Sequence, residues 1–173
     1  MKFPYSKILV VGCGGAGKST FARAVSARFG LPVVHLDKLW WLPNWTERSE
    51  AEFDELLARE LEKSKWVIDG NYLRTVKRRA EFADATVMLD VSPEVCIDSI
   101  YARGREYDGK TRPDMTEGCI ERVDDEFRTW VTDYPKHSRA AMLEALENSG
   151  KPFFVFDTRE KAYEWIDSFD AME

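Results

Sequence analysis

Short apolar runs alternate along the chain with longer segments in which apolar side chains recur every three or four residues. The short runs are typical of buried strands, and the longer segments are typical of amphipathic helices. The pattern predicts strands at about residues 7–11, 33–36, 66–69, 86–89 and 153–156. Because helical segments separate these strands, the sequence favours βαβ units, a parallel sheet and therefore an α/β fold.

Local start and stop signals bound the helical segments. Ser49 and the pair Ser92-Pro93 are typical N-terminal caps, and Gly30 is a typical helix end. Helices are predicted at about residues 17–29, 50–63, 72–82, 93–103, 120–132, 138–148 and 158–169. Residues 104–118 contain three glycines and Pro113 and are expected to form a loop.

The most informative motif lies directly after the first predicted strand. Residues 12–19 read Gly-Cys-Gly-Gly-Ala-Gly-Lys-Ser, which is the phosphate-binding loop pattern G-x-x-x-x-G-K-S/T between a strand and a helix. Backbone N–H groups of such a loop surround phosphate oxygens, while the lysine reaches the β- and γ-phosphates and the serine hydroxyl binds Mg²⁺. We therefore expect ATP to bind Gly12, Gly14, Gly15, Ala16, Gly17, Lys18, Ser19 and Thr20, and Mg²⁺ to bind Ser19.

Four predicted strands are followed by an aspartate: Asp37, Asp69, Asp90 and Asp157. This edge is where ligands bind in open α/β sheets, although such aspartates also serve as ordinary turn residues. Asp90 and Asp157 precede ordinary helix starts and are interpreted as structural. Asp69 is expected at the Mg²⁺ site. Asp37 is expected to orient or deprotonate the hydroxyl group of a phosphate acceptor.

Trp40, Trp41 and Trp45 lie close together between the second predicted strand and the next helix. Aromatic side chains stack on flat ligands and exclude water, so these residues are expected to line a substrate pocket within an acceptor-side segment at about 38–64. The alternative is that they cover the sheet edge as a small hydrophobic cluster.

Basic residues concentrate in two tracts, at 74–79 and 103–112, and continue at Arg122, Arg128 and Arg139. Arginine binds phosphate oxygens in a bidentate manner, and cations delivered by a mobile loop can complete a phosphoryl-transfer site after substrate binds. We expect a lid at about 104–118 and assign catalytic roles to Lys18, Asp37, Arg105, Arg112 and Arg122. The alternative is that most of these side chains form a solvated charged surface.

Composition limits the alternatives further. The chain has 173 residues, 44% of them hydrophobic, which is enough for one globular domain spanning residues 1–173. The net charge of −6 disfavours sequence-independent nucleic-acid binding, although a local basic patch could still support it. No apolar run is long enough to cross a membrane, the N-terminus does not look like a signal peptide, and the three cysteines lack C-x-x-C spacing. These features predict a cytoplasmic protein without a membrane partner, and none indicates an oligomeric state.

Longer strings resemble a known family. These are residues 12–19, His35-Leu36-Asp37, residues 66–72, Arg112-Pro113-Asp114 and Gly118-Cys119. Together they resemble the adenylate-kinase-related P-loop proteins known as DNA topology modulation proteins (the FlaR-like family), over about residues 5–169. The resemblance implies a three-layer P-loop NTPase fold of nucleoside-monophosphate-kinase type. It also implies a five-stranded parallel sheet of order 2-3-1-4-5, a mobile lid and an effect on DNA topology that need not be direct.

A more distant resemblance concerns nucleoside monophosphate kinases. Residues 68–70 with Arg74 are similar to their strand-end string, whose aspartate serves Mg²⁺ and whose arginine binds the acceptor phosphate, but this chain has one extra residue before Arg74. Arg103 resembles the arginine that packs on adenine, so it is expected to contact ATP. Residues 122–125 are similar to the string after the kinase lid, and either Arg128 or Arg139 could supply its second arginine.

Asp37 lies in a region similar to the acceptor-binding carboxylate of shikimate-kinase-like enzymes, and the acceptor-adenine motif of adenylate kinases is not evident. The sequence thus predicts an ATP- and Mg²⁺-dependent small-molecule kinase with a nucleotide-like or hydroxyl-bearing acceptor. Two alternatives stay open: an NTP-dependent regulator that acts on DNA topology, and a nucleotide sensor without transfer activity.

Overall fold

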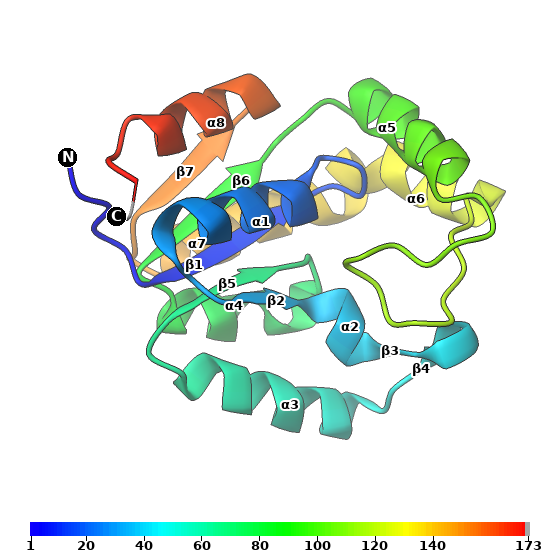
Figure 1. Ribbon diagram of the computed structural model, residues 1–173, viewed down its shortest axis with the longest axis horizontal. Helices are drawn as coiled ribbons and strands as arrows, with labels where there is room; N and C mark the ends of the chain where they lie inside the picture. Colours follow the sequence, from blue (N-terminus) through cyan, green and yellow to red (C-terminus); the bar gives the residue numbers. More distant parts are fainter. Residues whose placement is uncertain (172–173) are drawn as a thin grey trace.

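A five-stranded, all-parallel sheet forms the centre of the protein, and its strand order is β2-β5-β1-β6-β7 (Figure 1). The computed structural model describes residues 1–171. The strands are β1 (Lys7–Gly12), β2 (Val33–His35), β5 (Trp66–Asp69), β6 (Ala85–Leu89) and β7 (Phe153–Phe156). Since β5, β6 and β7 are the third, fourth and fifth predicted strands, the expected order 2-3-1-4-5 and the α/β P-loop fold are confirmed.

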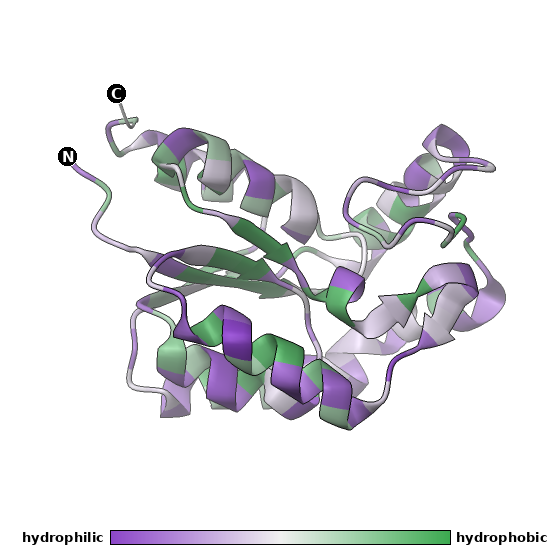
Figure 2. Cartoon of the chain, turned by 60° about the horizontal axis from the view of Figure 1, so that its bottom comes forward, coloured by the Kyte–Doolittle hydropathy of each residue, from purple (hydrophilic) through white to green (hydrophobic). Residues whose placement is uncertain are grey.

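Helices cover both faces of the sheet and complete three layers. One face packs against α1 (Lys18–Phe29), α5 (Pro93–Glu106), α6 (Asp125–Tyr134) and α8 (Arg159–Asp167). The other face packs against α3 (Glu50–Glu62), α4 (Leu73–Phe82) and α7 (Ala140–Asn148). Alternate residues of β1 enter the two cores, so residues 8–11 are all apolar, and the colouring of the central strands in Figure 2 illustrates this pattern. No helix among residues 1–171 has the length and apolar character needed to cross a bilayer.

The segment that carries the tryptophans is more ordered than predicted. After His35 the chain turns into α2 (Leu36–Trp40), followed by β3 (Trp41–Leu42), η1 (Pro43–Trp45) and β4 (Thr46–Glu47), of which β3 and β4 pair antiparallel. The prediction of a plain loop here, and of Asp37 at a strand end, is therefore wrong: Asp37 lies in the first turn of α2. Elements of two to five residues are too short to produce a readable periodicity, so the pattern could not indicate them.

The lid region also starts and ends later than expected. Helix α5 continues through Gly104 to Glu106, and α6 begins only at Asp125, where the Asp124 side chain accepts a hydrogen bond from the Phe127 N–H at 2.8 Å. The predicted helix start at about 120 is wrong because this cap, four residues later, sets the first turn. Beyond α6 the chain stays helical through a π-helical turn, η2 (Pro135–Arg139), before α7.

The turn between β5 and α4 depends on a buried cation. Arg79 has no exposed surface and donates to the carbonyl oxygens of Gly70 at 2.8 Å and Tyr72 at 3.1 Å, and also to that of Asn71. Burial lowers the pKa of Arg79 to about 9, so the guanidinium remains charged at neutral pH. Arg79 therefore stabilises the turn between β5 and α4. The basic tract at 74–79 suggested a phosphate-binding surface, but Arg79 does not belong to one.

We predict that Arg79→Leu lowers the free energy of unfolding by about 3 kcal/mol, because three buried or part-buried carbonyl groups lose their donor. Urea denaturation followed by circular dichroism measures this change. The adjacent Arg78→Leu is the matched control, since Arg78 is exposed, and it should shift stability by less than about 0.5 kcal/mol. Equal losses in the two variants would contradict the assigned role of Arg79.

Candidate functional site

The phosphate-binding loop connects β1 to α1 in a conformation that requires glycine. Gly15 and Gly17 have φ values of 81° and 99°, and a Cβ on Gly15 would lie 2.4 Å from the Cys96 carbonyl oxygen. The N–H groups of Gly14, Gly15 and Gly17 donate to no acceptor within residues 1–171. Together with the N-terminus of the twelve-residue α1, they form an anion-binding turn.

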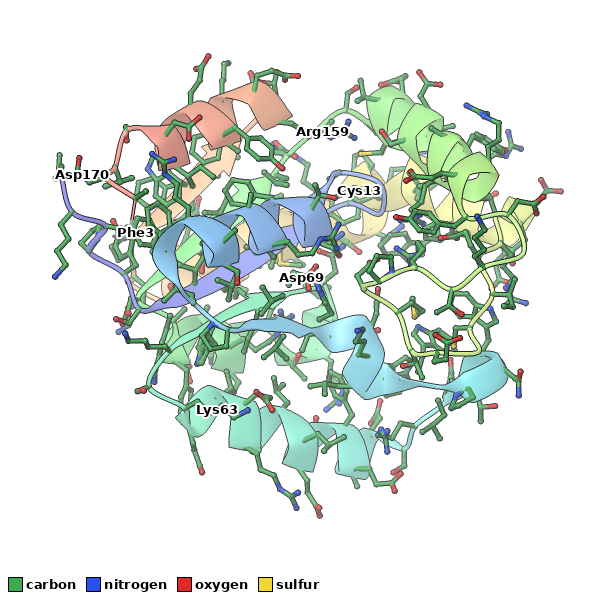
Figure 3. The ribbon with its side chains drawn as sticks, in the orientation of Figure 1. Phe3, Cys13, Lys63, Asp69, Arg159 and Asp170 are labelled. Carbon is green, nitrogen blue, oxygen red and sulfur yellow. The ribbon has the colours of Figure 1, made fainter. Side chains whose placement is uncertain are left out.

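Side chains from distant elements hold this loop. Arg159 donates from Nε to the Ala16 carbonyl at 3.0 Å and from Nη2 to the Gly15 carbonyl at 2.7 Å, reaching across from α8 as Figure 3 shows. Asn71 accepts a hydrogen bond from the Gly12 N–H at 2.9 Å. The expectation that Gly12 contacts phosphate is therefore wrong for its N–H group. Sequence reasoning missed Arg159, because no local pattern links it to a loop more than 140 residues away.

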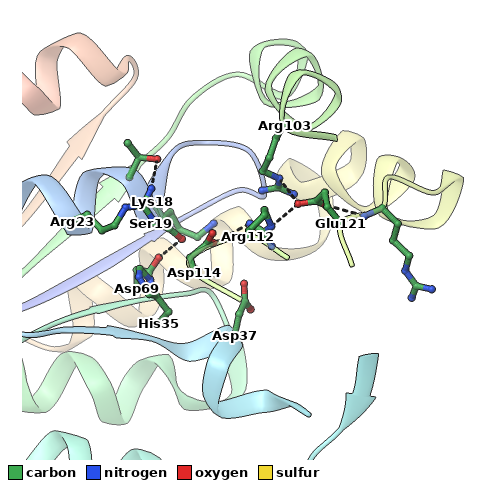
Figure 4. A network of polar contacts seen from close by, with 12 residues as sticks. Lys18, Ser19, Arg23, His35, Asp37, Asp69, Arg103, Arg112, Asp114 and Glu121 are labelled. Atoms are coloured by element: carbon green, nitrogen blue, oxygen red, sulfur yellow. Dashed lines mark hydrogen bonds and ion pairs between the residues drawn. The ribbon is translucent and has the colours of Figure 1, made fainter. Parts of the chain in front are cut away.

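Ser19 and Asp69 meet as predicted. The Ser19 hydroxyl donates to Asp69 Oδ2 at 2.5 Å, and the other carboxylate oxygen lies 2.7 Å from His35 Nδ1 (Figure 4). Lys18 Nζ donates to the Cys13 carbonyl at 2.9 Å. Burial lowers the pKa of Lys18, an effect that the Asp69 and Asp37 carboxylates oppose.

These residues fit a magnesium ion of the kind that accompanies ATP. The Ser19 hydroxyl donates its proton to Asp69, so its lone pairs remain available to a cation. No group of three or more His, Cys, Asp or Glu side chains in the described part of the chain could hold a metal by itself. Mg²⁺ commonly relies on one or two protein oxygens, with phosphate oxygens and water completing its octahedron. The donor set is therefore compatible with Mg²⁺ bound together with a polyphosphate.

Asp37 faces the same space from α2. Its Oδ1 accepts a hydrogen bond from the Tyr72 hydroxyl at 2.6 Å. Burial raises the pKa of Asp37, while the Tyr72 hydrogen bond and the Arg112 charge act in the opposite direction. A carboxylate with a raised pKa is a stronger proton acceptor than an exposed aspartate, which suits it to general-base chemistry.

The lid contains a chain of buried ion pairs, which we call the lid ion-pair network and which comprises Arg103, Glu121, Arg112 and Asp114. Glu121 Oε2 lies 3.1 Å from Arg103 Nε and 2.5 Å from Arg112 Nε, and Arg112 Nη1 lies 2.9 Å from Asp114 Oδ2. Figure 4 shows the network running from α5 toward Ser19 and Asp69. Sequence reasoning assigned no role to Glu121 or Asp114, because no local pattern indicates which carboxylate pairs with which arginine.

Asp114 is ionised within this network. Burial alone would raise the pKa of Asp114, but the Arg112 charge and the nearby Ser19 hydroxyl outweigh burial and lower it. The lid therefore brings a carboxylate beside the hydroxyl that is suited to Mg²⁺. It also holds Arg112 in one orientation.

Hydrogen bonds dock the lid on the tryptophan segment. Trp45 Nε1 donates to the Ile120 carbonyl at 2.8 Å, the Thr116 hydroxyl donates to the Trp41 carbonyl at 2.6 Å, and the Asn44 N–H donates to the Gly118 carbonyl at 3.3 Å. The lid and the acceptor-side segment thus form a continuous cover.

Beneath this cover lies a cavity of about 1230 Å³. It is lined by the phosphate-binding loop and by Asp37, Asp69, Arg103 and Arg112. Trp40, Trp41 and Trp45 also line it, and that they contact a substrate there stays a prediction. Trp40 packs against the hydrophobic core as well. One cavity therefore joins an anion-binding turn, a carboxylate pair and an aromatic wall.

Other predicted site residues do not enter the cavity. Arg105 is exposed on α5 and is not among the lining residues, and Arg74 pairs with Asp54 at 2.8 Å. Arg122, by contrast, is among the lining residues, with a side chain that is 62% exposed and a guanidinium 5.2 Å from the centre of the Trp45 ring.

Neither candidate for the second arginine after the lid lines the cavity. Arg128 is exposed and lies 3.9 Å from Asp125. Arg139 binds Asp90 through contacts of 2.8 and 2.7 Å. This ion pair agrees with the structural role expected for Asp90.

Solved structures with the same fold include two kinases. The chain aligns with shikimate kinase from Acinetobacter baumannii in complex with shikimate at a TM-score of 0.63 and 16% identity, covering 95% of this chain and 93% of that one. It aligns with deoxyadenosine kinase from M. mycoides with bound dATP at a TM-score of 0.55 and 15% identity, covering 94% and 97%. The sequence matches no protein-family model and no curated protein. At these identities the likeness establishes a P-loop kinase-like fold.

We predict that Glu121→Gln loosens the lid, because Arg103 and Arg112 would lose the charge that neutralises both. Removing one partner of a buried ion pair costs about 3–5 kcal/mol, and local opening should absorb much of this cost. Hydrogen exchange of residues 107–124 should accelerate at least tenfold. Glu117→Gln, an exposed lid residue, is the control and should leave exchange unchanged. Identical exchange in both variants would show that the network does not hold the lid.

Proposed function

We propose that the protein is a kinase that transfers the γ-phosphoryl group of ATP to a hydroxyl group of a small acceptor. The observation that carries this proposal is that Lys18 of the phosphate-binding loop and Asp37 of α2 line one cavity. A sensor of nucleotides needs only the first of these groups. A buried carboxylate with a raised pKa in the same space is a feature that phosphoryl transfer to a hydroxyl uses.

On the donor side, the N–H groups of Gly14, Gly15 and Gly17 bind phosphate oxygens, and Lys18 turns from the Cys13 carbonyl toward the β- and γ-phosphates. The Ser19 hydroxyl oxygen would bind Mg²⁺. Asp69 accepts a hydrogen bond from this hydroxyl, so the oxygen lone pairs remain available to the ion. When bound, Mg²⁺ neutralises charge that develops on the phosphate oxygens. Arg103 lies beside the nucleotide, as the resemblance to nucleoside monophosphate kinases implies.

On the acceptor side, Asp37 accepts a hydrogen bond from the reacting hydroxyl and takes its proton as the oxygen bonds to phosphorus. The bond between the γ-phosphorus and its bridging oxygen breaks, so ADP leaves and the phosphorylated acceptor remains. Arg112 lies beside Asp37 closely enough to influence its pKa and can stabilise charge on the transferring group. Arg122 contributes from the cavity edge, and Arg105 acts only if the lid moves.

Two further parts of the proposal concern organisation and family. Residues 1–173 act as a single kinase-like domain, with a lid at about 104–118 and an acceptor-side segment at about 38–64. The FlaR-like relationship rests on the strings quoted above. The kinases among the solved structures support a phosphotransferase, and no separate observation favours a DNA-acting regulator. Arg79 and Arg112 of the basic tracts are buried, which weakens the case for an exposed DNA-binding face.

We predict that wild-type protein binds Mg·ATP in isothermal titration and releases ADP in the presence of an acceptor. Lys18→Ala should reduce the rate of transfer by about 10²–10³-fold, because a cation directed at the transferring group is lost. Lys77→Ala, an exposed residue on α4, is the control. Absence of Mg·ATP binding by the folded wild-type protein would refute the proposed function.

We predict that Tyr72→Phe moves the acidic limb of the pH–rate profile to higher pH. The Tyr72 hydrogen bond lowers the pKa of Asp37, so its loss raises that pKa further. Because transfer requires the ionised carboxylate, activity is then lost at a higher pH as the solution is acidified. Initial rates measured between pH 4 and pH 9 test this shift. An acidic limb that stays in place or moves to lower pH would contradict a role for Asp37 as the base.

A further inference from the structure

We infer that the acceptor is an uncharged compound with a hydroxyl group and a flat or apolar face, and that it is neither a phosphate ester nor a carboxylate. This inference rests on the proposed kinase function and identifies the substrate class of the same site. It concerns the acceptor half of the cavity, which we define as the part lined by residues 36–47 and 69–73.

The first argument is the charge of this lining. The acceptor half contains the carboxylates of Asp37 and Glu47, and Asp69, which is hydrogen-bonded to Ser19 on the donor side, borders it. Within the described residues, neither of its two segments contributes a cation to the lining. Lys38 belongs to the first segment but is exposed and is not among the lining residues.

The second argument is that the neighbouring arginines already have partners. Arg48 donates to the Leu39 carbonyl at 2.8 Å, and Arg74 is paired with Asp54 at the protein surface. Arg79 is enclosed beneath the turn after β5, where it binds carbonyl groups. Arg112, the lining cation whose charge acts on Asp37, lies between the carboxylates of Asp114 and Glu121. Binding an anionic acceptor through these side chains would require breaking existing ion pairs or hydrogen bonds.

Arg122 does not make the acceptor half favourable for an anion. Its side chain is 62% exposed at the cavity edge, and its guanidinium lies over the Trp45 ring. An acceptor phosphate or carboxylate is normally held by bidentate arginine contacts that exclude water. An anion in the acceptor half would instead lose hydration beside the carboxylates of Asp37 and Glu47, so the site selects against it by repulsion.

The third argument is the shape of the aromatic wall. Trp41 and Trp45 meet edge to face, with centroids 5.4 Å apart and an interplanar angle of 77°. Trp40 packs edge to face against Phe53 at 5.5 Å. Edge-to-face packing fixes the orientation of each ring. Arg122 lies over the Trp45 ring, and the aromatic surface of the wall as a whole offers a flat ligand apolar and stacking contacts. A nucleoside base and the apolar face of a sugar ring share this chemistry, and both compounds carry hydroxyl groups.

The test compares matched pairs that differ in charge. One arm compares deoxyadenosine with its 5′-monophosphate, and then other nucleosides with their own 5′-monophosphates. The other uses glucose with gluconate and glucose 6-phosphate, and further sugars in the same way. Quenching of tryptophan fluorescence is titrated in the presence of a non-hydrolysable ATP analogue, and ADP release is measured separately with ATP.

We expect a neutral member of at least one arm to bind at least tenfold more tightly than its charged partner, with weaker quenching in Trp41→Phe. Equal or tighter binding of the charged partner would overturn the inference, as would the absence of binding by every neutral compound. If a neutral compound binds but releases no ADP, the proposed kinase function fails and the inferred ligand class stands.

A charge reversal tests the repulsion directly. Glu47→Lys should narrow the preference for the neutral member by about tenfold, and the uncharged Glu47→Gln should have a smaller effect. Glu55→Lys on α3 introduces the same charge at an exposed position outside the cavity and should leave the preference intact. An unchanged preference in Glu47→Lys would show that the acceptor-half charge does not select the ligand.

Discussion

The turn between β1 and α1 must direct its N–H groups into a cavity while its carbonyl groups point elsewhere, and the site depends on this constraint. Glycine makes the backbone conformation possible, since a side chain on Gly15 would collide with the Cys96 carbonyl. Arg159 then binds the Gly15 and Ala16 carbonyl oxygens, and Asn71 binds the Gly12 N–H. Residues of α5 and α8 therefore hold the loop, and the N–H groups of Gly14, Gly15 and Gly17 remain without a partner within residues 1–171.

The second determinant of the site is electrostatic and lies in the lid. Glu121 is buried between two arginines, and Asp114 extends the same chain of charges toward Ser19. In a region of low dielectric constant, each of these charges is costly unless its partners are in place. The network therefore links the position of α5 to that of Arg112, so the lid behaves as a unit. The hydrogen bonds from the lid to Trp41 and Trp45 extend this unit to the acceptor-side segment.

The lining side chains of the two halves of the cavity carry opposite charge, and the proposed chemistry depends on this difference. The donor half offers free N–H groups, Lys18 and Arg103, which suit a polyphosphate. The acceptor half offers Asp37, Glu47 and aromatic faces, which suit a neutral hydroxyl compound. A phosphoryl group would then pass from a positively charged environment toward a carboxylate that can accept a proton.

The sequence by itself determined the sheet, its strand order, the phosphate-binding loop and the meeting of Ser19 with Asp69. These features follow from local signals: apolar periodicity, glycine spacing, and the placement of strand ends along one edge of a parallel sheet. Only the tertiary structure decided that Asp37 lies in the first turn of α2 and that Arg159 binds the carbonyl groups of the phosphate-binding loop. It also decided the burial of Arg79 and the lid ion-pair network. Each of these depends on burial or on contacts between separate segments of the chain. The strength of such contacts depends on packing and on the local dielectric environment, and neither can be deduced from a local pattern of residues.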